Sequence, residues 1–157
     1  MIDLRAATGA DAEACLGVQR RSALAGYAHI FRQDVYPFPD DVVRAEWVTR
    51  LASDAGVLLA VVEGEIVGTA SASPPRLEAL FVVPEHWGTG VAGRLHDRVI
   101  EIIGAAGCPA AELDVMADNH RARRFYERRG WNPDGRVLRS PFPPYPELLG
   151  YRLPILR

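Results

Sequence analysis

A glycine-rich segment near the middle of this chain reads Pro84-Glu85-His86-Trp87-Gly88-Thr89-Gly90-Val91-Ala92-Gly93. It follows an apolar run over 76–83 that predicts a strand, and it opens a helical pattern that continues to about residue 105. Glycines at a strand–helix junction let backbone N–H groups turn toward one point, and the helix N-terminus adds partial positive charge. The stretch therefore predicts a pyrophosphate site, although the same glycines also fit an ordinary tight turn.

Two common phosphate-binding loops do not fit this stretch. A Walker A loop needs Gly-Lys-Ser/Thr, and all 18 basic residues of this chain are arginine. The spacing Gly88-x-Gly90-x-x-Gly93 does match the bare dinucleotide fingerprint. However, it follows the fourth expected strand rather than the first, and no acidic strand end follows about 20 residues later. A nucleotide-binding module therefore stays only as a rival hypothesis.

The flanking sequence predicts one mixed α/β sheet with helices on both faces. Strands are expected at 2–5, 57–62, 66–73, 76–83, 111–116, around 137 and at 148–154. Helices are expected from a capping box at 8–11 to about 25, and at 41–53, 89–105 and 119–129. The predicted order is β-α-α-β-β-β-α-β-α-β-β.

Composition limits the class of protein. The chain has 157 residues, 48% hydrophobic and 24% charged, as expected for one domain over residues 1–157. Its net charge of −2 provides no basic field for nucleic acid. No apolar run reaches membrane-spanning length, residues 1–5 do not begin a signal peptide, and the two cysteines have no metal-site spacing. We therefore expect a cytoplasmic enzyme or binding protein with no metal, nucleic-acid partner or membrane association.

A second informative segment reads Asn119-His120-Arg121-Ala122-Arg123-Arg124-Phe125-Tyr126-Glu127-Arg128-Arg129-Gly130-Trp131. Asn119 fits a helix cap. Asn119, Ala122 and Tyr126 recur at helical spacing, so they can line one groove. A solvated arginine face with Phe125 and Tyr126 in the core is the alternative, but the hydroxyl of a buried tyrosine needs a partner.

Together the two segments resemble the GNAT acetyltransferase superfamily. Its cofactor motif, Arg/Gln-x-x-Gly-x-Gly/Ala, matches Trp87-x-x-Gly90-x-Ala92, and its downstream motif, Asn-x-x-Ala-x-x-Phe-Tyr-x-x-x-Gly-Phe, matches 119–131. Trp87 departs from the Arg/Gln consensus, which removes one side chain from the phosphate site but leaves the backbone donors. The resemblance covers nearly the whole chain. It implies an acyl-CoA N-acyltransferase fold, with a mixed, mostly antiparallel sheet flanked by about four helices.

The resemblance also implies a site for acetyl-CoA as cosubstrate. The backbone groups of Val82 and Val83 would pair with the pantetheine arm as an added strand would, and residues 87–93 would hold the pyrophosphate. The implied contact residues are Phe81, Val82, Val83, Trp87, Gly88, Thr89, Gly90, Val91, Ala92, Gly93, Asn119, Ala122, Phe125, Tyr126 and Arg128. The candidates for the outer phosphates are Arg94, Arg121, Arg124 and Arg128.

For catalysis, the resemblance assigns Tyr126 as the general acid for the leaving thiolate, because a phenol with an ordinary pKa of about 10 is protonated at neutral pH. The N–H of Val82 is the expected oxyanion donor. Two carboxylates in otherwise apolar strands, Glu78 and Asp114, stay open as the general base. Strand alternation would put Glu78 on the face of Leu80, and we prefer Glu78.

The resemblance further implies that the acceptor binds between the first two helices and the last hairpin. Aromatic and acidic residues gather there: Tyr27, His29, Phe31, Tyr36, Phe38, Trp47, Phe142 and Tyr145, with Asp34, Asp40, Asp41 and Glu46. This combination suits an amine cation stacked on aromatic rings, and equally suits plain packing. A small-molecule amine or a peptide stays open as the acceptor, and a homodimer is expected. The main rival is a non-catalytic acyl-CoA-binding or sensor domain on the same fold.

Overall fold

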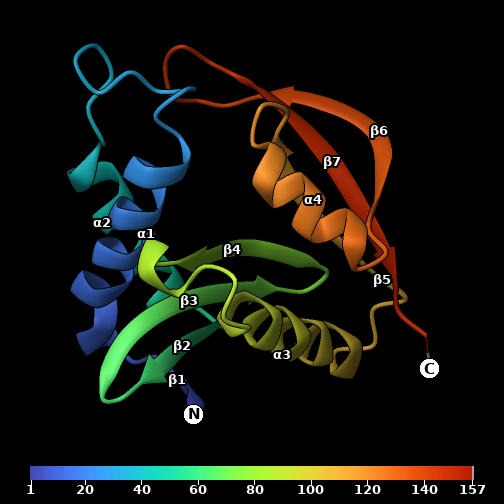
Figure 1. Ribbon diagram of the computed structural model, residues 1–157. Helices are drawn as coiled ribbons and strands as arrows, with labels where there is room; N and C mark the ends of the chain where they lie inside the picture. The colour runs from blue at the N-terminus through green and yellow to red at the C-terminus, as the bar shows by residue number, and fades with distance from the viewer. Residues whose placement is uncertain (157) are drawn as a thin grey trace.

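One sheet of seven strands forms the centre of the computed structural model, which describes residues 1–156 (Figure 1). The strands are β1 (Ile2–Ala6), β2 (Gly56–Val62), β3 (Glu65–Ser73), β4 (Arg76–Val82), β5 (Ala110–Met116), β6 (Asn132–Arg139) and β7 (Glu147–Pro154). They lie in the order β1-β2-β3-β4-β5-β7-β6, and the β4–β5 pair is parallel whereas the other neighbouring pairs are antiparallel. The predicted mixed, mostly antiparallel sheet is confirmed.

Helices cover both faces of this sheet, as predicted. They are α1 (Ala12–Gly26), α2 (Asp40–Leu51), α3 (Val91–Ala105) and α4 (His120–Arg128). Alternate residues of a strand point to opposite faces. Accordingly, Val57 and Leu59 of β2 pack in the core under α1 and α2, whereas Leu58 and Ala60 join the larger core under α3 and α4. Among the described residues, no helix has both the length and the apolar character needed to cross a membrane.

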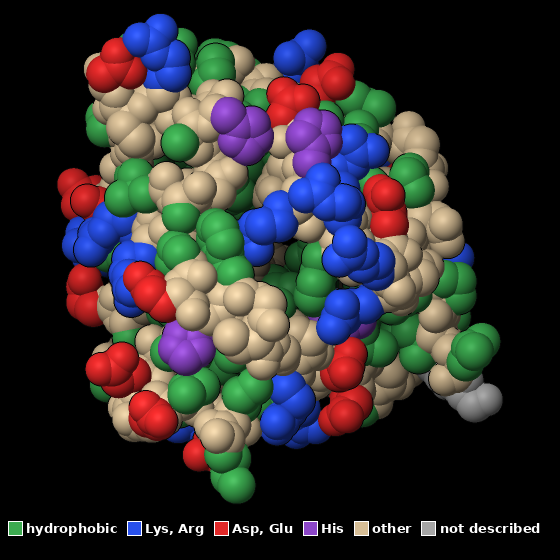
Figure 2. Space-filling view, viewed as in Figure 1, with side chains coloured by type: hydrophobic (Ala, Val, Ile, Leu, Met, Phe, Trp, Pro, Cys, Tyr) green, Lys and Arg blue, Asp and Glu red, His purple; other side chains and the backbone are tan. Residues whose placement is uncertain are grey.

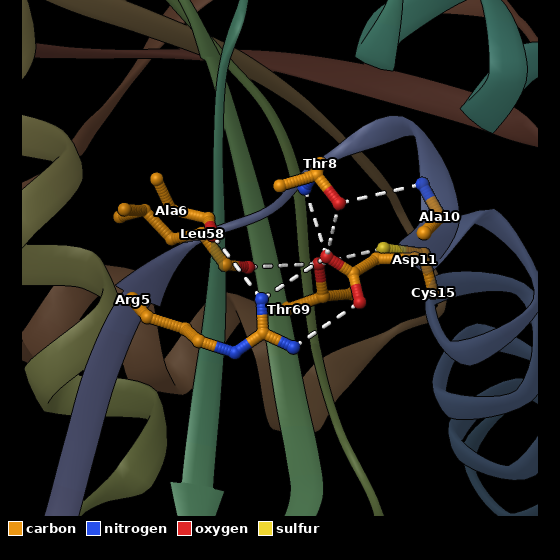
Figure 3. A network of polar contacts seen from close by, with 8 residues as sticks. All are labelled: Arg5, Ala6, Thr8, Ala10, Asp11, Cys15, Leu58 and Thr69. Carbon is orange, nitrogen blue, oxygen red and sulfur yellow. Dashed lines mark hydrogen bonds and ion pairs between the residues drawn. The ribbon is translucent and has the colours of Figure 1, made fainter.

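A polar network fixes the start of α1 against the sheet (Figure 3). The carboxylate of Asp11 accepts the Thr8 N–H at 2.8 Å and the Arg5 guanidinium at 3.0 Å, which confirms the predicted capping box. These hydrogen bonds, that of Arg5 above all, hold the pKa of Asp11 below its usual value. One turn later, Cys15 Sγ lies 3.6 Å from Thr69 Oγ1 of β3. The network therefore ties β1, α1 and β3 together.

The sheet opens between its two parallel strands. β4 and β5 are paired only at Arg76 and Glu112, where the Glu112 N–H donates to the Pro75 carbonyl at 2.9 Å. Beyond this point the two strands are not paired with each other. Opening a sheet leaves backbone groups without strand partners, so this gap is where a ligand can take their place.

Candidate active site

A cavity of about 1050 Å³ opens where β4 and β5 separate. Its lining comes from both strands, the loop before α3, α4, the segment between α1 and α2, and the β6–β7 loop. Figure 2 shows a hollow with basic side chains along one side and hydrophobic side chains beside it. Because the chain has no lysine, all of these basic side chains are arginines. We call the part beside α3 and α4 the cationic half, and the part between residues 27–39 and 140–146 the aromatic half.

The backbone of β4 directs polar groups into the gap. Val83 donates its N–H to the Val67 carbonyl of β3 at 2.9 Å. In an antiparallel pair alternate residues bond to the same neighbour, so Phe81 also faces β3, whereas Leu80 and Val82 direct their N–H and C=O groups toward β5. The backbone groups of Val82 thus point into the gap, as pairing with a pantetheine arm would require. The predicted pairing is wrong for the N–H of Val83, because that group is part of the sheet.

The loop before α3 presents a cluster of backbone donors. Gly88 and Gly90 have φ values of 75° and 93°, which L side chains rarely adopt. The first helical hydrogen bond runs from the Arg94 N–H to the Gly90 carbonyl at 3.1 Å, so the N–H groups of residues 91–93 have no acceptor inside the helix. These donors and the helix dipole suit an anion such as a pyrophosphate. The side chain of Val91 is buried in the core, so only its backbone can take part.

The sequence motifs do not single out Arg129, yet this residue reaches the start of α3. A Cβ on Gly93 would collide with its Nη2 atom, so the guanidinium lies directly on the first turn of α3. Its Cζ atom also lies 4.1 Å from the centre of the Phe125 ring. The arginines that line the cationic half are Arg121, Arg124, Arg128 and Arg129, whereas Arg94 is not part of the lining. A run of arginines carries no local signal of which one turns inward.

Trp87 contacts both β4 and an arginine of α4. Its indole N–H donates to the Val82 carbonyl at 2.7 Å, and the Arg121 guanidinium lies 3.6 Å from the ring centre. Trp87 therefore uses one of the β4 groups that point into the gap, in addition to removing the Arg/Gln side chain of the consensus. The Val82 N–H and the backbone groups of Leu80 are still directed into the gap, so the residues present fit a pantetheine arm.

Tyr126 lies in the lining where the two halves meet. Its ring makes edge contacts with Phe125 at 5.3 Å and Trp131 at 5.8 Å between centroids, and it is only 7% exposed. Burial, reinforced by Tyr27 of the aromatic half and opposed by Arg121 of the cationic half, raises the pKa of Tyr126 far above its ordinary value. The phenol therefore keeps its proton through the neutral range and can donate it.

A buried contact between α3 and the end of α4 supports Tyr126. Trp131 donates its indole N–H to His96 Nε2 at 3.0 Å, and His96 Nδ1 lies 2.9 Å from the Asp97 carboxylate. Because an indole nitrogen only donates, Nε2 must accept, so the ring is neutral with its proton on Nδ1. Burial accordingly lowers the pKa of His96. At the other end of α4, the Asn119 side chain accepts the Ala122 N–H at 3.3 Å, which confirms the predicted cap.

Glu78 lines the cavity at an irregularity in β4. It is an extra residue between Leu77 and Ala79, and it has no pairing partner on β3. Its carboxylate lies 3.5 Å from the Arg50 Nε atom of α2. The prediction that alternation puts Glu78 on the face of Leu80 is wrong: Leu80 packs on the core under α3, and the bulge turns Glu78 toward α2.

Asp114 also lines the cavity; the Arg76 guanidinium donates a hydrogen bond to it, whereas the Arg136 guanidinium lies within ion-pair distance but donates none. Its Oδ2 atom lies 2.7 Å from Arg76 Nη2, and its Oδ1 atom lies 3.3 Å from Arg136 Nη1. The structure thus brings both base candidates to one cavity and leaves Glu78 less engaged than Asp114. Within residues 1–156, no three His, Cys, Asp or Glu side chains gather closely enough to hold a metal ion.

The aromatic half contains some of the expected acceptor residues and excludes others. Its lining includes Tyr27, Phe31, Tyr36, Phe38, Phe142 and Pro143. Trp47 is not among them, because it is fully buried under α1 and donates to Gln19 Oε1 at 2.7 Å. His29 is also outside, with its Nε2 atom 2.8 Å from the Asp118 carbonyl. Burial raises the pKa of Tyr27 to about 12.

The sequence and the fold of this chain are similar to those of known proteins. Residues 23–131 match the Acetyltransferase (GNAT) family. An uncharacterized N-acetyltransferase of Archaeoglobus fulgidus is 29% identical over 120 residues, covering 69% of this chain and 77% of that relative. A GCN5-related N-acetyltransferase of Rhodopseudomonas palustris has the same fold, with a TM-score of 0.82 and 21% identity over 98% of this chain and 95% of its own. The PaiA N-acetyltransferase of Thermoplasma acidophilum, solved in complex with coenzyme A, has a TM-score of 0.81 and 16% identity over 99% of each chain. The family match spans well over half of the sequence and includes both motifs, and so this protein belongs to the acetyltransferase (GNAT) family.

Proposed function

We propose that this protein transfers an acetyl group from acetyl-CoA to a primary amine of a small molecule or peptide, by direct attack in a ternary complex. One observation carries the proposal: a single cavity joins the donor cluster at residues 91–93, the outward-facing backbone of Leu80 and Val82, and the buried phenol of Tyr126. The first two suit the phosphate and amide groups of CoA, and the relative from Thermoplasma acidophilum was solved with CoA.

The cationic half is the proposed site for the CoA phosphates. The N–H groups of residues 91–93 would bind the pyrophosphate, and Arg129 would add a full positive charge at the same place, since it already lies on Gly93. Arg124 and Arg128 line the same half and are available for the outer phosphate. The pantetheine arm would then follow β4 toward Tyr126.

At the reacting centre, the amine nitrogen forms a bond to the thioester carbon while the carbon–sulfur bond breaks. We assign the removal of the ammonium proton to Glu78, directly or through water, because its ion pair with Arg50 at 3.5 Å is longer than the ion pair of Asp114 with Arg76 at 2.7 Å. The Val82 N–H would stabilise the charge that develops on the carbonyl oxygen. Tyr126 would donate its phenolic proton to the departing thiolate, and the second proton that the attacking nitrogen loses as the amide forms would restore the phenol.

A thiol-release assay with acetyl-CoA over a panel of primary amines tests this function. Tyr126→Phe is expected to lower kcat about 100-fold on the best amine, with the Kd for CoA unchanged. Tyr145→Phe is the matched control, because Tyr145 is 53% exposed and lies outside the cavity lining. Tight CoA binding with no thiol release across the panel would instead indicate a non-catalytic acyl-CoA-binding domain. Equal rates for wild type and Tyr126→Phe would refute the acid role.

A further inference from the structure

A buried pair of residues outside the cavity lining supports the proposed general acid. The pair is His96 of α3 and Trp131, which follows α4. Resting on the proposed function, we infer that His96 is a positioning residue for acetyl transfer: it holds the Trp131 ring in place, and Trp131 in turn sets the direction of the Tyr126 phenol. The inference depends on a hydrogen bond, on ring packing and on a departure from the family motif.

Water cannot replace the hydrogen bond of this pair. Trp131 donates its indole N–H to His96 Nε2 at 3.0 Å, and the two residues are only 1% and 4% exposed. Because an indole only donates, His96 must be neutral and carry its proton on Nδ1. The Asp97 carboxylate, 2.9 Å from Nδ1, accepts the hydrogen bond of this proton and so fixes the tautomer. Without the acceptor nitrogen, the buried indole N–H would have no partner, and its ring would have to move to find one.

Both rings that flank Tyr126 rest on His96. The centroid of the Tyr126 ring lies 5.8 Å from that of Trp131 and 5.3 Å from that of Phe125, both in edge contacts. His96 makes edge contacts with the same two rings, at 5.9 Å from Phe125 and 6.2 Å from Trp131. The backbone N–H of Trp131 also donates to the Tyr126 carbonyl at 3.2 Å. Close-packed rings have little room to adjust, so a shift of the Trp131 ring is passed on to the phenol.

Trp131 stands where the family motif ends in phenylalanine. A phenylalanine has no donor and needs no acceptor, whereas the indole of Trp131 needs one in the core. His96 supplies that acceptor from the buried side of α3. The other buried residues of α3 all lack polar side chains: Val91, Gly93, Leu95, Val99 and Ile103. Because a buried polar group is unfavourable without a partner, the two residues form a matched pair in this chain.

A double-mutant cycle on kcat tests the pair. His96→Leu removes the acceptor and is expected to lower kcat for the best amine about tenfold, because a misdirected phenol donates its proton less effectively. The Kd for CoA should change less than about twofold, since the donors of residues 91–93 belong to the backbone. Adding Trp131→Phe removes the unpaired N–H and restores the family residue, so kcat should return to within about threefold of wild type. No recovery in the double variant would contradict the pairing.

Two amides at position 96 separate the acceptor from the bulk of the ring. The side-chain oxygen of a glutamine can take the place of Nε2, whereas that of the shorter asparagine reaches only as far as Nδ1. His96→Gln is therefore expected to keep kcat within about threefold of wild type, and His96→Asn to lower it about tenfold. His120→Leu, at an exposed position of α4 outside the cavity lining, is the control and should leave kcat unchanged. Equal kcat values for the two amide variants would overturn the inference.

A measurement that needs no turnover separates this inference from the proposed function. The NMR ring resonances of isotope-labelled tyrosines, assigned with Tyr126→Phe, report the surroundings of the phenol in the free protein and in the protein saturated with CoA. The Tyr126 resonances are expected to move in His96→Asn and to stay near their wild-type positions in His96→Gln. If no amine releases thiol, the acetyltransfer proposal fails, yet this difference still supports the positioning role. Tyr126 resonances that respond equally to both amides would refute the role even if turnover is observed.

Discussion

The cationic half of the cavity is built from backbone groups and helix ends, whereas the aromatic half is built from side chains on two irregular segments. In the cationic half, the donors of residues 91–93 keep their direction whatever side chains they carry, because the helix and two left-handed glycines fix them. In the aromatic half, Phe38 and Phe142 are in place only because two distant segments fold toward each other.

This difference explains how one half tolerates a departure from the family motif. Trp87 replaces the consensus Arg or Gln, yet the donor cluster next to it is intact. The aromatic half has no such backbone framework, so a change of side chain changes what it binds. We expect substitutions in the cationic half to alter CoA affinity. Substitutions in the aromatic half and at Glu78 are expected to alter turnover and the choice of amine.

The largest effect is expected from Glu78→Gln. Removing the proposed base should lower kcat/KM for the best amine about 100-fold and leave the Kd for CoA unchanged. Asp114→Asn is the matched comparison and is expected to lower kcat/KM less than about fivefold, because that carboxylate is already occupied by Arg76 and Arg136. Thermal unfolding of both variants checks that the fold is kept. A larger loss in Asp114→Asn would reverse the assignment of the base.

The next largest effect is expected in the cationic half and concerns CoA binding. Arg129→Ala is expected to weaken CoA binding about tenfold, because it removes the guanidinium that lies on Gly93 at the start of α3. The KM for the amine should stay the same. Arg98→Ala, which removes an exposed arginine paired with Glu101 at 2.7 Å on α3, is the control and should change neither quantity. A rise in the amine KM alone would show that the two halves are not separate sites.

A smaller effect is expected from Trp87→Phe. Phenylalanine keeps an aromatic ring for Arg121 but removes the N–H that occupies the Val82 carbonyl. If that carbonyl is then free for the pantetheine arm, CoA should bind about threefold more tightly, as measured by calorimetry. Weaker binding would show that the indole organises the site instead of competing for it.

Features that depend on local sequence can be predicted, whereas features that depend on packing between distant segments cannot. The order of strands and helices, the capping box at Thr8 and Asp11, the Asn119 cap and the donor loop all follow from signals within about ten residues of each other, and the structure confirms them. Local sequence does not predict the bulge at Glu78, because the bulge depends on the pairing of β4 with β3. It does not predict the burial of Trp47 either, because that burial depends on α1.

The least predictable feature of the site is which charged side chains face the cavity. Asp40 and Asp41 gave the acceptor region an acidic sequence, but in the structure both are ion-paired outside the cavity lining. Local sequence does not distinguish Arg129 from the neighbouring arginines, because only the turn at the end of α4 directs it to Gly93. Local sequence specifies which charges are present, whereas long-range packing decides which of them a ligand meets.

The smallest expected effect concerns which half controls the proton of Tyr126. Burial, together with Tyr27 of the aromatic half, raises the pKa of Tyr126, and Arg121 of the cationic half opposes them. A group with a raised pKa keeps its proton until the pH passes the raised value, so the acid form should be fully present up to at least about pH 10. At saturating amine, kcat should therefore fall less than about twofold between about pH 8 and about pH 9.5. A steep fall in this range that is lost in Tyr126→Phe would mean that the phenol ionises there, and that Arg121 outweighs burial once both substrates are bound.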